Sequence, residues 1–469
     1  MHNLKLSLAA LMSLALFACA QPERTKESPT LVHDHGHSHD AGEEESPAAP
    51  APAPSTLITN VRIFNGVSST LSAASNVLIV GNTIARISSE AIDAEGALVI
   101  DGGGRTLMPG LIDAHTHIMF STLPQVAILT SDIGFVNLAA GKAANEMLMR
   151  GFTSVRDLGG PIFGLKKAID MGIVEGPRIW PSGAFISQSG GHGDFRLPNE
   201  IPAKPDDFSY GEKVNAAAIA DDPASVRKRA REQLMLGASQ LKLMAGGGVS
   251  SVYDPIDVTQ YTVEEIRAAV EAAENWGTYV TVHAYTPRAV QQSIEAGVKC
   301  IDHGQMLDEA TARTMAQKGI WWSLQPFVED GRSPFAEGTP NRIKQQKMYA
   351  GTDQAYALAK KHGIKTAWGT DILFSAANAK RQNEKLTLMT RWYTPAEVLR
   401  MATSVNAELL ALSGERSPYA GKLGVVENGA LADLLLVDGD PLADISILSD
   451  PAKNLVLIIK DGRIVKNGL

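Results

Sequence analysis

Six side chains that could bind metal ions or move protons fall at the ends of segments with the pattern of short buried strands. The first such segment ends with two histidines, His115 and His117. Residues two apart on a strand project to the same side, so both imidazoles could bind one ion. The other four follow later in the chain: Lys242, His283, His303 and Asp371. Imidazole and carboxylate ligands suit zinc or a similar divalent ion.

The segments that must position these residues alternate between strand and helix patterns from about residue 109 to residue 415. The strand candidates are 111–116, 152–157, 178–185, 240–245, 279–284, 299–303, 320–325 and 365–370. A helix is predicted over 262–276, where Thr262 and Glu265 form a capping box, and another begins at Thr394-Pro395. Eight strand–helix units favour an α/β fold, a closed (β/α)8 TIM barrel, over an open sheet, and such barrels carry their active sites where the strands end.

Both flanks of this region have the alternating pattern of short strands. The predicted strands cover 57–65, 76–88 and 97–101 on one side and 433–437 and 455–460 on the other. Asp461-Gly462 then gives a hairpin signal. We therefore expect a small β-sandwich built from residues 57–108 and 418–469, with the barrel over 109–417.

The stretch Pro109-Gly110-Leu111-Ile112-Asp113-Ala114-His115-Thr116-His117 resembles the first-strand signature of the amidohydrolase superfamily. The resemblance extends over roughly residues 57–469. It implies two divalent ions, expected to be Zn²⁺, with His115, His117 and Asp371 on the buried ion and His283 and His303 on the outer one.

The same resemblance implies that Lys242 is an N6-carboxylysine that bridges the two ions. The modification has a physical reason, because a bare ammonium between two cations would be repelled, whereas a carbamate offers an oxygen to each. The alternative is an ordinary buried lysine paired with Asp371.

Such a centre implies a hydrolytic mechanism. A hydroxide that bridges the ions would attack a carbonyl, because metal binding lowers the pKa of water to about 7 in favourable cases. Asp371 would take a proton from it and return it to the leaving amine as the general acid/base. Tyr285, two residues past His283, is the candidate donor to the carbonyl oxygen; the alternative is an aromatic side chain that merely packs.

Two loops narrow the substrate class. The loops 187–194 and 244–251 resemble those of the prolidase-like and carboxypeptidase-like branch, which also includes imidazolonepropionase relatives and enzymes that cleave the amide of ochratoxin. Members of this branch mostly hydrolyse an amide next to a free carboxylate. The resemblance gives His192 a catalytic and substrate-binding role, and Arg288 could pair with the carboxylate. An ordinary surface arginine is an equal alternative for Arg288, and for Asp157 we expect a structural ion pair in the neighbourhood of Arg156.

The N-terminus has the features of an export signal. Lys5 precedes an apolar run from Leu6 to Ala18, which is too short to span a bilayer comfortably, so residues 1–18 are predicted to be a signal peptide. Leu16-Phe17-Ala18-Cys19 resembles a bacterial lipobox, with Cys19 as the lipidated mature N-terminus. Cleavage after Ala20, which would give a soluble periplasmic protein, is the alternative.

Residues 19–56 are rich in Pro, Ala, Glu, Ser and His and are predicted to be a disordered tether. Its segment His33–Asp40 either captures zinc weakly or is a solvated spacer. Together these features predict an exported lipoprotein of the outer membrane or facing the periplasm, which touches the membrane only through its N-terminal lipid.

Composition limits the function further. The chain is 44% hydrophobic with a formal charge of −8 and no basic block, so a globular protein that does not bind nucleic acid is expected. The leading hypothesis is a binuclear hydrolase for a small-molecule amide, dipeptide or N-acyl amino acid. The alternatives are a cyclic amide or lactone hydrolase on the same site, and a non-catalytic periplasmic zinc-binding lipoprotein. Homo-oligomer formation stays open.

Overall fold

The computed structural model describes residues 53–201 and 207–469. The predictions on the signal peptide, on Cys19 and on the His-rich segment of the tether lie outside these residues. Within the two described stretches, no helix combines the length and the apolar character that crossing a membrane requires.

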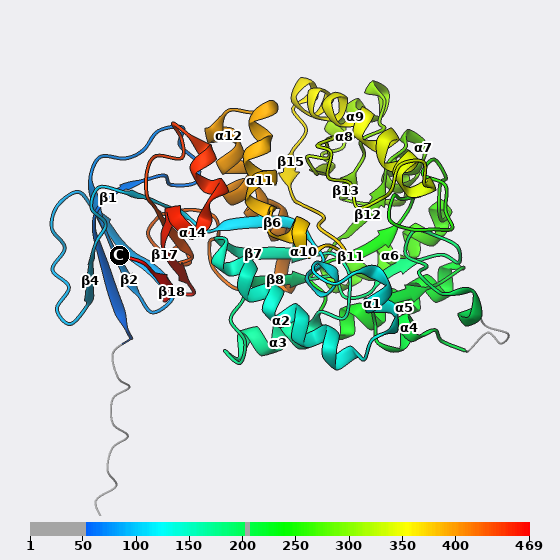
Figure 1. The fold of residues 1–469 in the computed structure, drawn as a ribbon, viewed down its shortest axis with the longest axis horizontal. Coiled ribbons are helices and arrows are strands. Elements are labelled where there is room, and N and C mark those ends of the chain that lie inside the picture. Colours follow the sequence, from blue (N-terminus) through cyan, green and yellow to red (C-terminus); the bar gives the residue numbers. More distant parts are fainter. Residues whose placement is uncertain (1–52, 202–206) are drawn as a thin grey trace, which may run out of the picture. The chain divides into compact units, whose positions relative to one another are not determined.

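Strands from both ends of the chain form one hydrogen-bonded sheet, in the order β18-β17-β16-β5-β1-β2-β3 with β4 beside β1. They are β1 (Ser55–Ile63), β2 (Ser75–Val80), β3 (Thr83–Ser88), β4 (Leu98–Asp101), β5 (Thr106–Pro109), β16 (Leu434–Val437), β17 (Leu455–Lys460) and β18 (Arg463–Asn467). The two ends meet where β5 pairs antiparallel with β16, and Figure 1 shows the blue and red strands together. Strands of both flanks thus share one sheet, whereas the β-sandwich stays a prediction.

The hairpin prediction at Asp461-Gly462 is confirmed. Both residues have positive φ, 56° and 72°, and they connect the antiparallel strands β17 and β18. The predicted segment 76–88 is itself a hairpin of β2 and β3 rather than one strand, because the chain turns at Gly81-Asn82.

The middle of the chain is an α/β fold with two parallel sheets. One has the order β6-β7-β8 and the other β10-β9-β11-β12-β13-β14-β15. Their strands are β6 (Leu111–Thr116), β7 (Phe152–Asp157), β8 (Arg178–Pro181), β9 (Phe185–Ser187), β10 (Ala217–Ile219), β11 (Leu241–Met244), β12 (Val280–Ala284), β13 (Cys300–His303), β14 (Trp321–Leu324) and β15 (Thr366–Trp368). After β15, the backbone N–H of Asp371 donates to the carbonyl of His115 at 2.8 Å. The last strand therefore ends beside the first, as in a TIM-barrel-like domain.

The third predicted strand, 178–185, is in fact two strands that belong to different sheets. β8 pairs with β7, whereas β9 pairs with β11. Gly183 lies between them with φ +73°, and a Cβ there would meet Gln233 Oε1 at 2.4 Å. The chain thus breaks at a residue that must be glycine, and β10 is an edge strand that was not predicted.

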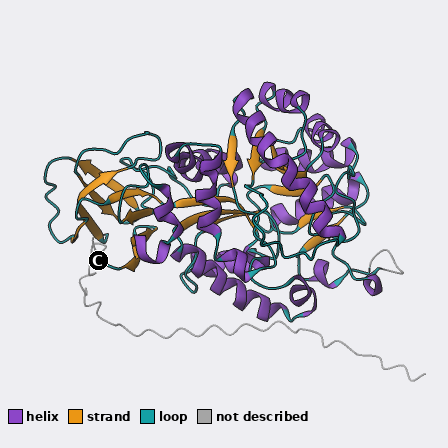
Figure 2. Cartoon of the chain, turned by 45° about the horizontal axis from the view of Figure 1, so that its top comes forward, coloured by secondary structure: helices purple, strands orange, loops and turns teal. Residues whose placement is uncertain are grey.

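Helices cover the outside of the parallel sheets, in purple around the orange strands of Figure 2. The α-helices are α1 (Gln125–Thr130), α2 (Ile133–Met149), α3 (Phe163–Asp170), α4 (Tyr210–Lys213), α5 (Pro223–Met235), α6 (Val263–Trp276), α7 (Pro287–Ala296), α8 (Glu309–Gln317), α9 (Pro340–His362), α10 (Ala376–Ala379), α11 (Gln382–Thr387), α12 (Pro395–Arg400), α13 (Asn406–Leu410) and α14 (Pro451–Asn454). Short 3-10 turns cover Ile118–Phe120, Pro198–Glu200, Leu388–Arg391, Ala411–Arg416 and Ile445–Ser449, and Met401–Val405 is a π-helical turn. The predicted capping box at Thr262 is confirmed and begins α6; the predicted helix start at Thr394-Pro395 is also confirmed, with Thr394 as N-cap of α12 in a capping box with Glu397.

Candidate active site

A cavity of about 350 Å³ lies where the parallel strands end. Eight of the nine side chains predicted for the site line this cavity: His115, His117, His192, Lys242, His283, Tyr285, His303 and Asp371. The ninth, Arg288, is the second residue of α7, where its side chain is exposed, and it does not belong to the cavity wall.

The two histidines of the first strand converge on Asp371. Asp371 Oδ1 lies 3.4 Å from His115 Nε2 and 3.3 Å from His117 Nε2. His115, His303 and Asp371 each offer one ligand atom, and these three atoms lie within 4.8 Å of one another. These three residues could therefore hold a metal ion, and His117 lies close enough to join them.

Two of these ligands follow their strands with a left-handed backbone. His303 has φ 75° and Asp371 has φ 50°, a region that side chains other than glycine rarely adopt. Such backbone strain concentrates at functional sites, where surrounding contacts hold it in place. Here it turns both side chains toward the common centre.

Hydrogen bonds fix which nitrogen of each histidine faces the centre. His303 Nδ1 lies 2.7 Å from Gln325 Oε1, and His117 Nδ1 lies 3.3 Å from the carbonyl of Gly159. An N–H on each of these atoms leaves Nε2 free as a ligand. Burial lowers the pKa of His115 to about 4 and that of His303 well below its usual range, so both imidazoles are neutral, as metal ligands must be.

The ring of His283 lies between those of His303 and His192, close to both. Its ring centroid is 4.4 Å from that of His303 and 4.0 Å from that of His192. His283 Nε2 lies 3.0 Å from the carbonyl of Gly247, which leaves Nδ1 as its free nitrogen. His283 and His303 are thus adjacent, as the prediction of an outer metal ion requires.

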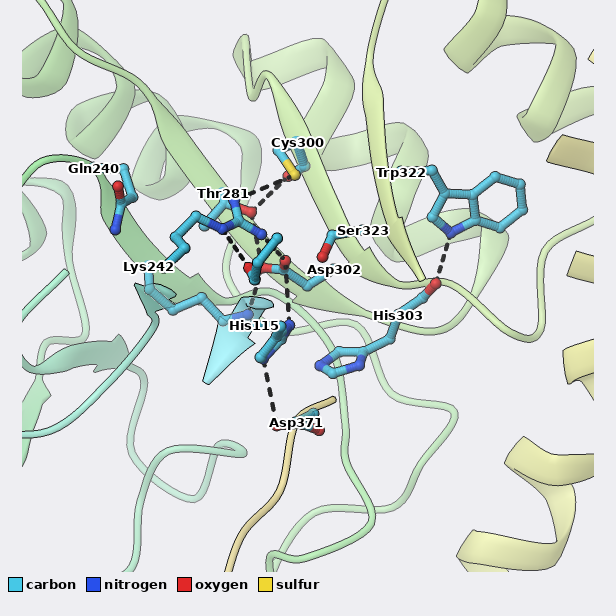
Figure 3. A network of polar contacts seen from close by, with 12 residues as sticks. His115, Gln240, Lys242, Thr281, Cys300, Asp302, His303, Trp322, Ser323 and Asp371 are labelled. Atoms are coloured by element: carbon cyan, nitrogen blue, oxygen red, sulfur yellow. Dashed lines mark hydrogen bonds and ion pairs between the residues drawn. The ribbon is translucent and has the colours of Figure 1, made fainter. Parts of the chain in front are cut away.

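Beneath these ligands lies a buried ionic network that the sequence analysis missed, and Figure 3 shows it around Asp302. Asp302 Oδ2 accepts from Lys242 Nζ at 2.5 Å, and Oδ1 accepts from Arg156 Nη2 at 2.8 Å. Oδ1 also lies 3.4 Å from His115 Nδ1. Burial would raise the pKa of Asp302, but Lys242 and Arg156 hold it well below its usual range. Asp302 is therefore an anion, and it connects Lys242 with His115 of β6.

This network corrects two expectations. Lys242 pairs with Asp302 and not with Asp371. Arg156 also pairs with Asp302, so the ion pair expected between Asp157 and its neighbour does not form. Asp157 instead accepts hydrogen bonds from the backbone of Ile118 and from the Thr116 hydroxyl.

Tyr285 lies against both outer histidines. Its ring centroid is 4.9 Å from that of His283 and 5.2 Å from that of His303. Burial raises its pKa well above the usual value, so the phenol keeps its proton. The hydroxyl donates to Met348 Sδ at 3.2 Å, a weak acceptor that a carbonyl oxygen can replace.

His192 is held by the loop that follows β11. Its Nδ1 lies 2.7 Å from the Ser251 hydroxyl and 3.8 Å from Asp254 Oδ2. A Cβ at Gly248 would meet the His192 ring at 1.9 Å, so the backbone of this loop packs directly on the imidazole. Lys344 of α9 holds the loop in turn by donating to the carbonyls of Ser251 and Asp254.

Aromatic side chains form another wall of the cavity. The ring of Phe120 lies 6.3 Å from that of Phe185 and 6.4 Å from that of Phe374, and Phe195 lies 6.0 Å from Phe185. All four line the cavity. A mostly apolar cavity with a few converging polar groups is typical of sites for small molecules.

The donor set fits divalent metal ions. Two buried imidazoles and one carboxylate offer ligand atoms within 4.8 Å of one another, with His117 and His283 beside them, and a cluster of this composition suits zinc or a similar ion. Lys242 is paired with Asp302 here, and a lysine ammonium could join such a centre only after carboxylation.

Comparison with known proteins agrees with this site. The amidohydrolase family matches residues 106–465. Ochratoxinase of Aspergillus niger is 31% identical over 77% of this chain and 75% of its own length. A prolidase crystallised with N-methylphosphonate-L-proline is 33% identical with a TM-score of 0.79, over 88% of this chain and 100% of its own. A Xaa-Pro dipeptidase with bound methionine is 27% identical with a TM-score of 0.74, over 88% and 100%. The chain belongs to the amidohydrolase family.

Proposed function

We propose that this protein is a binuclear metal-dependent hydrolase that cleaves the amide bond of a dipeptide or an N-acyl amino acid with a free carboxylate. The observation that carries the proposal is the convergence of His115, His303 and Asp371 within 4.8 Å at a cavity whose other wall is aromatic. The relatives support it, because a prolidase, a Xaa-Pro dipeptidase and ochratoxinase are named among them.

In this proposal His115, His117 and Asp371 would hold one ion, His283 and His303 would hold the other, and Lys242 would contribute a further ligand after carboxylation. The parallel strands close into a barrel that fixes these six residues on one rim. Two divalent ions, when bound, would activate a water molecule and polarise the carbonyl. The chain's own residues supply the positioning and the proton transfers.

Asp371 is the proton carrier. Burial would raise its pKa, but the nearby imidazoles of His115 and His117 hold it well below its usual value, so it begins as an anion that can accept a proton. Asp371 then gives this proton to the nitrogen of the leaving amine. Tyr285 donates a hydrogen bond to the carbonyl oxygen, where negative charge develops.

Carboxylation of Lys242 requires the lysine to give up its ion pair with Asp302. Burial lowers the pKa of Lys242 even though Asp302 opposes this, which favours the neutral amine that reacts with CO₂. Arg156 would then be the remaining cation beside Asp302. The buried guanidinium therefore keeps Asp302 compensated in both states of the lysine.

The test is a library of Xaa-Pro dipeptides, other dipeptides and N-acyl amino acids, assayed with the zinc-loaded protein. We expect hydrolysis of at least one member, about two metal equivalents per chain, and loss of activity in His115→Ala and Lys242→Ala by roughly 100-fold or more. His362→Ala is the matched control, because His362 lies at the end of α9 away from the cavity. Hydrolysis of no member would refute the proposed substrate class, and ring substrates in the same assay would detect a cyclic amide or lactone hydrolase.

A further inference from the structure

Five cationic side chains line the cavity, and four of them are neutralised by a partner. Arg196 Nη2 lies 2.6 Å from Asp194, Lys242 Nζ lies 2.5 Å from Asp302, and Arg332 Nη1 lies 3.4 Å from Glu384. Arg381 pairs with Asp330 at 2.6 Å and with Glu384 at 2.8 Å. The fifth cation, Lys385 of α11, forms no ion pair or hydrogen bond through its ammonium with any residue in 53–201 or 207–469.

The Lys385 ammonium lies near the metal ligands and close to an aromatic ring. Nζ is 5.9 Å from the ring centroid of Phe327, and that ring stacks at 6.2 Å on His303. One phenyl ring therefore separates the ammonium from a predicted metal ligand. Both Phe327 and Lys385 line the cavity.

The carboxylates of Asp330, Asp371 and Asp113 act on this ammonium only from a distance, so no direct partner among the described residues compensates its charge. Lys385 is partly buried, and burial together with the nearby guanidinium of Arg381 lowers its pKa. Removing a charge from water without a partner costs free energy, so buried charges are normally paired. An anion that enters the cavity would give the Lys385 ammonium the direct partner that it lacks among the described residues.

We propose that Lys385 binds the free carboxylate of the substrate and so makes the enzyme selective for amides that carry one. This inference rests on the proposed function. It assigns the binding of the carboxylate to Lys385 in place of Arg288, which lies outside the cavity. A single unpaired ammonium matches a single negative charge. The arginines around this cavity, whose guanidinium groups would suit bidentate recognition of a phosphate, already pair with carboxylates of the protein.

The substrate class follows from the two kinds of side chain that line the cavity. Lys385 and the candidate metal ligands are polar, whereas Phe120, Phe185, Phe195 and Phe374 offer apolar aromatic surface. A compound that fits both carries a bulky apolar group at one end and a monoanionic carboxylate at the other. N-acylated or dipeptide derivatives of this amphipathic kind are the expected substrates.

The experiment compares each hydrolysed member of the library with its C-terminal carboxamide, in the wild type and in Lys385→Met. For the free acid we expect Lys385→Met to raise KM about 10- to 100-fold, as for loss of a hydrogen bond to a charged group, while kcat changes less than about threefold. The carboxamide should already be a poor substrate for the wild type and lose little more in the variant. Lys385→Arg, which keeps the charge, should recover most of the affinity.

Two control variants separate this role from general charge effects. Lys380→Met removes an exposed lysine near α11, and Arg288→Met removes the arginine that could pair with the carboxylate according to the sequence analysis; both should leave KM for the free acid unchanged. The zinc content of Lys385→Met should equal that of the wild type, because no metal ligand is altered.

The outcomes distinguish this inference from the proposed function. If the free acid and the carboxamide are hydrolysed equally well, or if Lys385→Met impairs both equally, the hydrolase proposal stands and the role of Lys385 is refuted. If no library member is hydrolysed, the proposed function fails, and calorimetric titration of zinc-loaded protein with N-acetyl-L-phenylalanine and its carboxamide tests the lysine alone. Equal affinity for both compounds, or binding of neither, then overturns the inference.

Discussion

Replacing Arg156 by methionine tests whether the ionic network beneath the ligands supports the fold. The guanidinium is fully buried, and it donates to Asp302 at 2.8 Å, to the carbonyl of Ala114 at 2.6 Å and to the Tyr279 hydroxyl at 3.2 Å. Methionine fills a similar volume but removes these hydrogen bonds and a fourth, from Nη1 to Cys300 Sγ at 3.6 Å. Asp302 would keep Lys242 as its remaining cationic partner.

The size of the effect follows from burial. Breaking a buried ion pair by removing one partner costs about 3–5 kcal/mol, because the other charge stays buried without full compensation. Ala114 lies on a fully buried strand, so its carbonyl finds no water to replace the guanidinium. We therefore expect Arg156→Met to lower the free energy of unfolding by about 3–5 kcal/mol, which is a large part of the stability of an ordinary domain.

The assay is urea-induced unfolding followed by circular dichroism, with Arg391→Met as the control. Arg391 also forms a short ion pair, 2.6 Å to Asp353, but the two side chains are 51% and 59% exposed. An exposed pair contributes about 0–1 kcal/mol, so the control should stay close to the wild type. Equal losses in the two variants would refute the argument that burial makes the Arg156 network important. Because Asp302 also contacts His115, Arg156→Met should bind less zinc than the control.

Two further predictions concern other parts of the molecule. Gly248→Ala should push the His192 ring aside, because the new Cβ would lie 1.9 Å from it; we expect at least a tenfold loss of kcat/KM with unchanged zinc content, whereas Gly164→Ala, with nothing within 4 Å, should behave as the wild type. Full activity of Gly248→Ala would show that this contact does not position His192. Arg178→Met should leave the buried carboxylate of Asp433, 2.7 Å away, without its partner and lower the free energy of unfolding by about 3–5 kcal/mol. A loss below about 1 kcal/mol in urea unfolding would contradict the importance of this link between the parallel strands and the terminal sheet.

The candidate metal ligands could be predicted because strand patterns fix where side chains point. His115 and His117 had to share one side of their strand, and His283, His303 and Asp371 each follow a segment whose strand character was plain. The structure places all of them on one cavity. Local signals also predicted where α6 and α12 begin, a capping box at Thr262 and proline after Thr394, because such signals depend only on neighbouring residues.

The residues that the sequence analysis missed depend on contacts between distant segments. Arg156 and Asp302 are 146 residues apart, and nothing local says that they pair. A signal was present, because each is a charged residue inside an otherwise apolar strand, where an unpaired charge would be costly. Lys385 lies on a short helix whose orientation is set by packing, so its exposure to the cavity could not be inferred. Arg288 lies outside the cavity because it is in the first turn of α7, where its side chain is exposed to solvent.

The pairing of β5 with β16 has a consequence for synthesis on the ribosome. β5 ends at Pro109, and its partner begins only at Leu434. At roughly 5–20 residues per second, the nascent chain waits on the order of 15–60 s before that partner is made. During this time one edge of β5 has unpaired backbone groups that could join another chain. Truncated products that stop before Leu434 are therefore expected to aggregate through this edge.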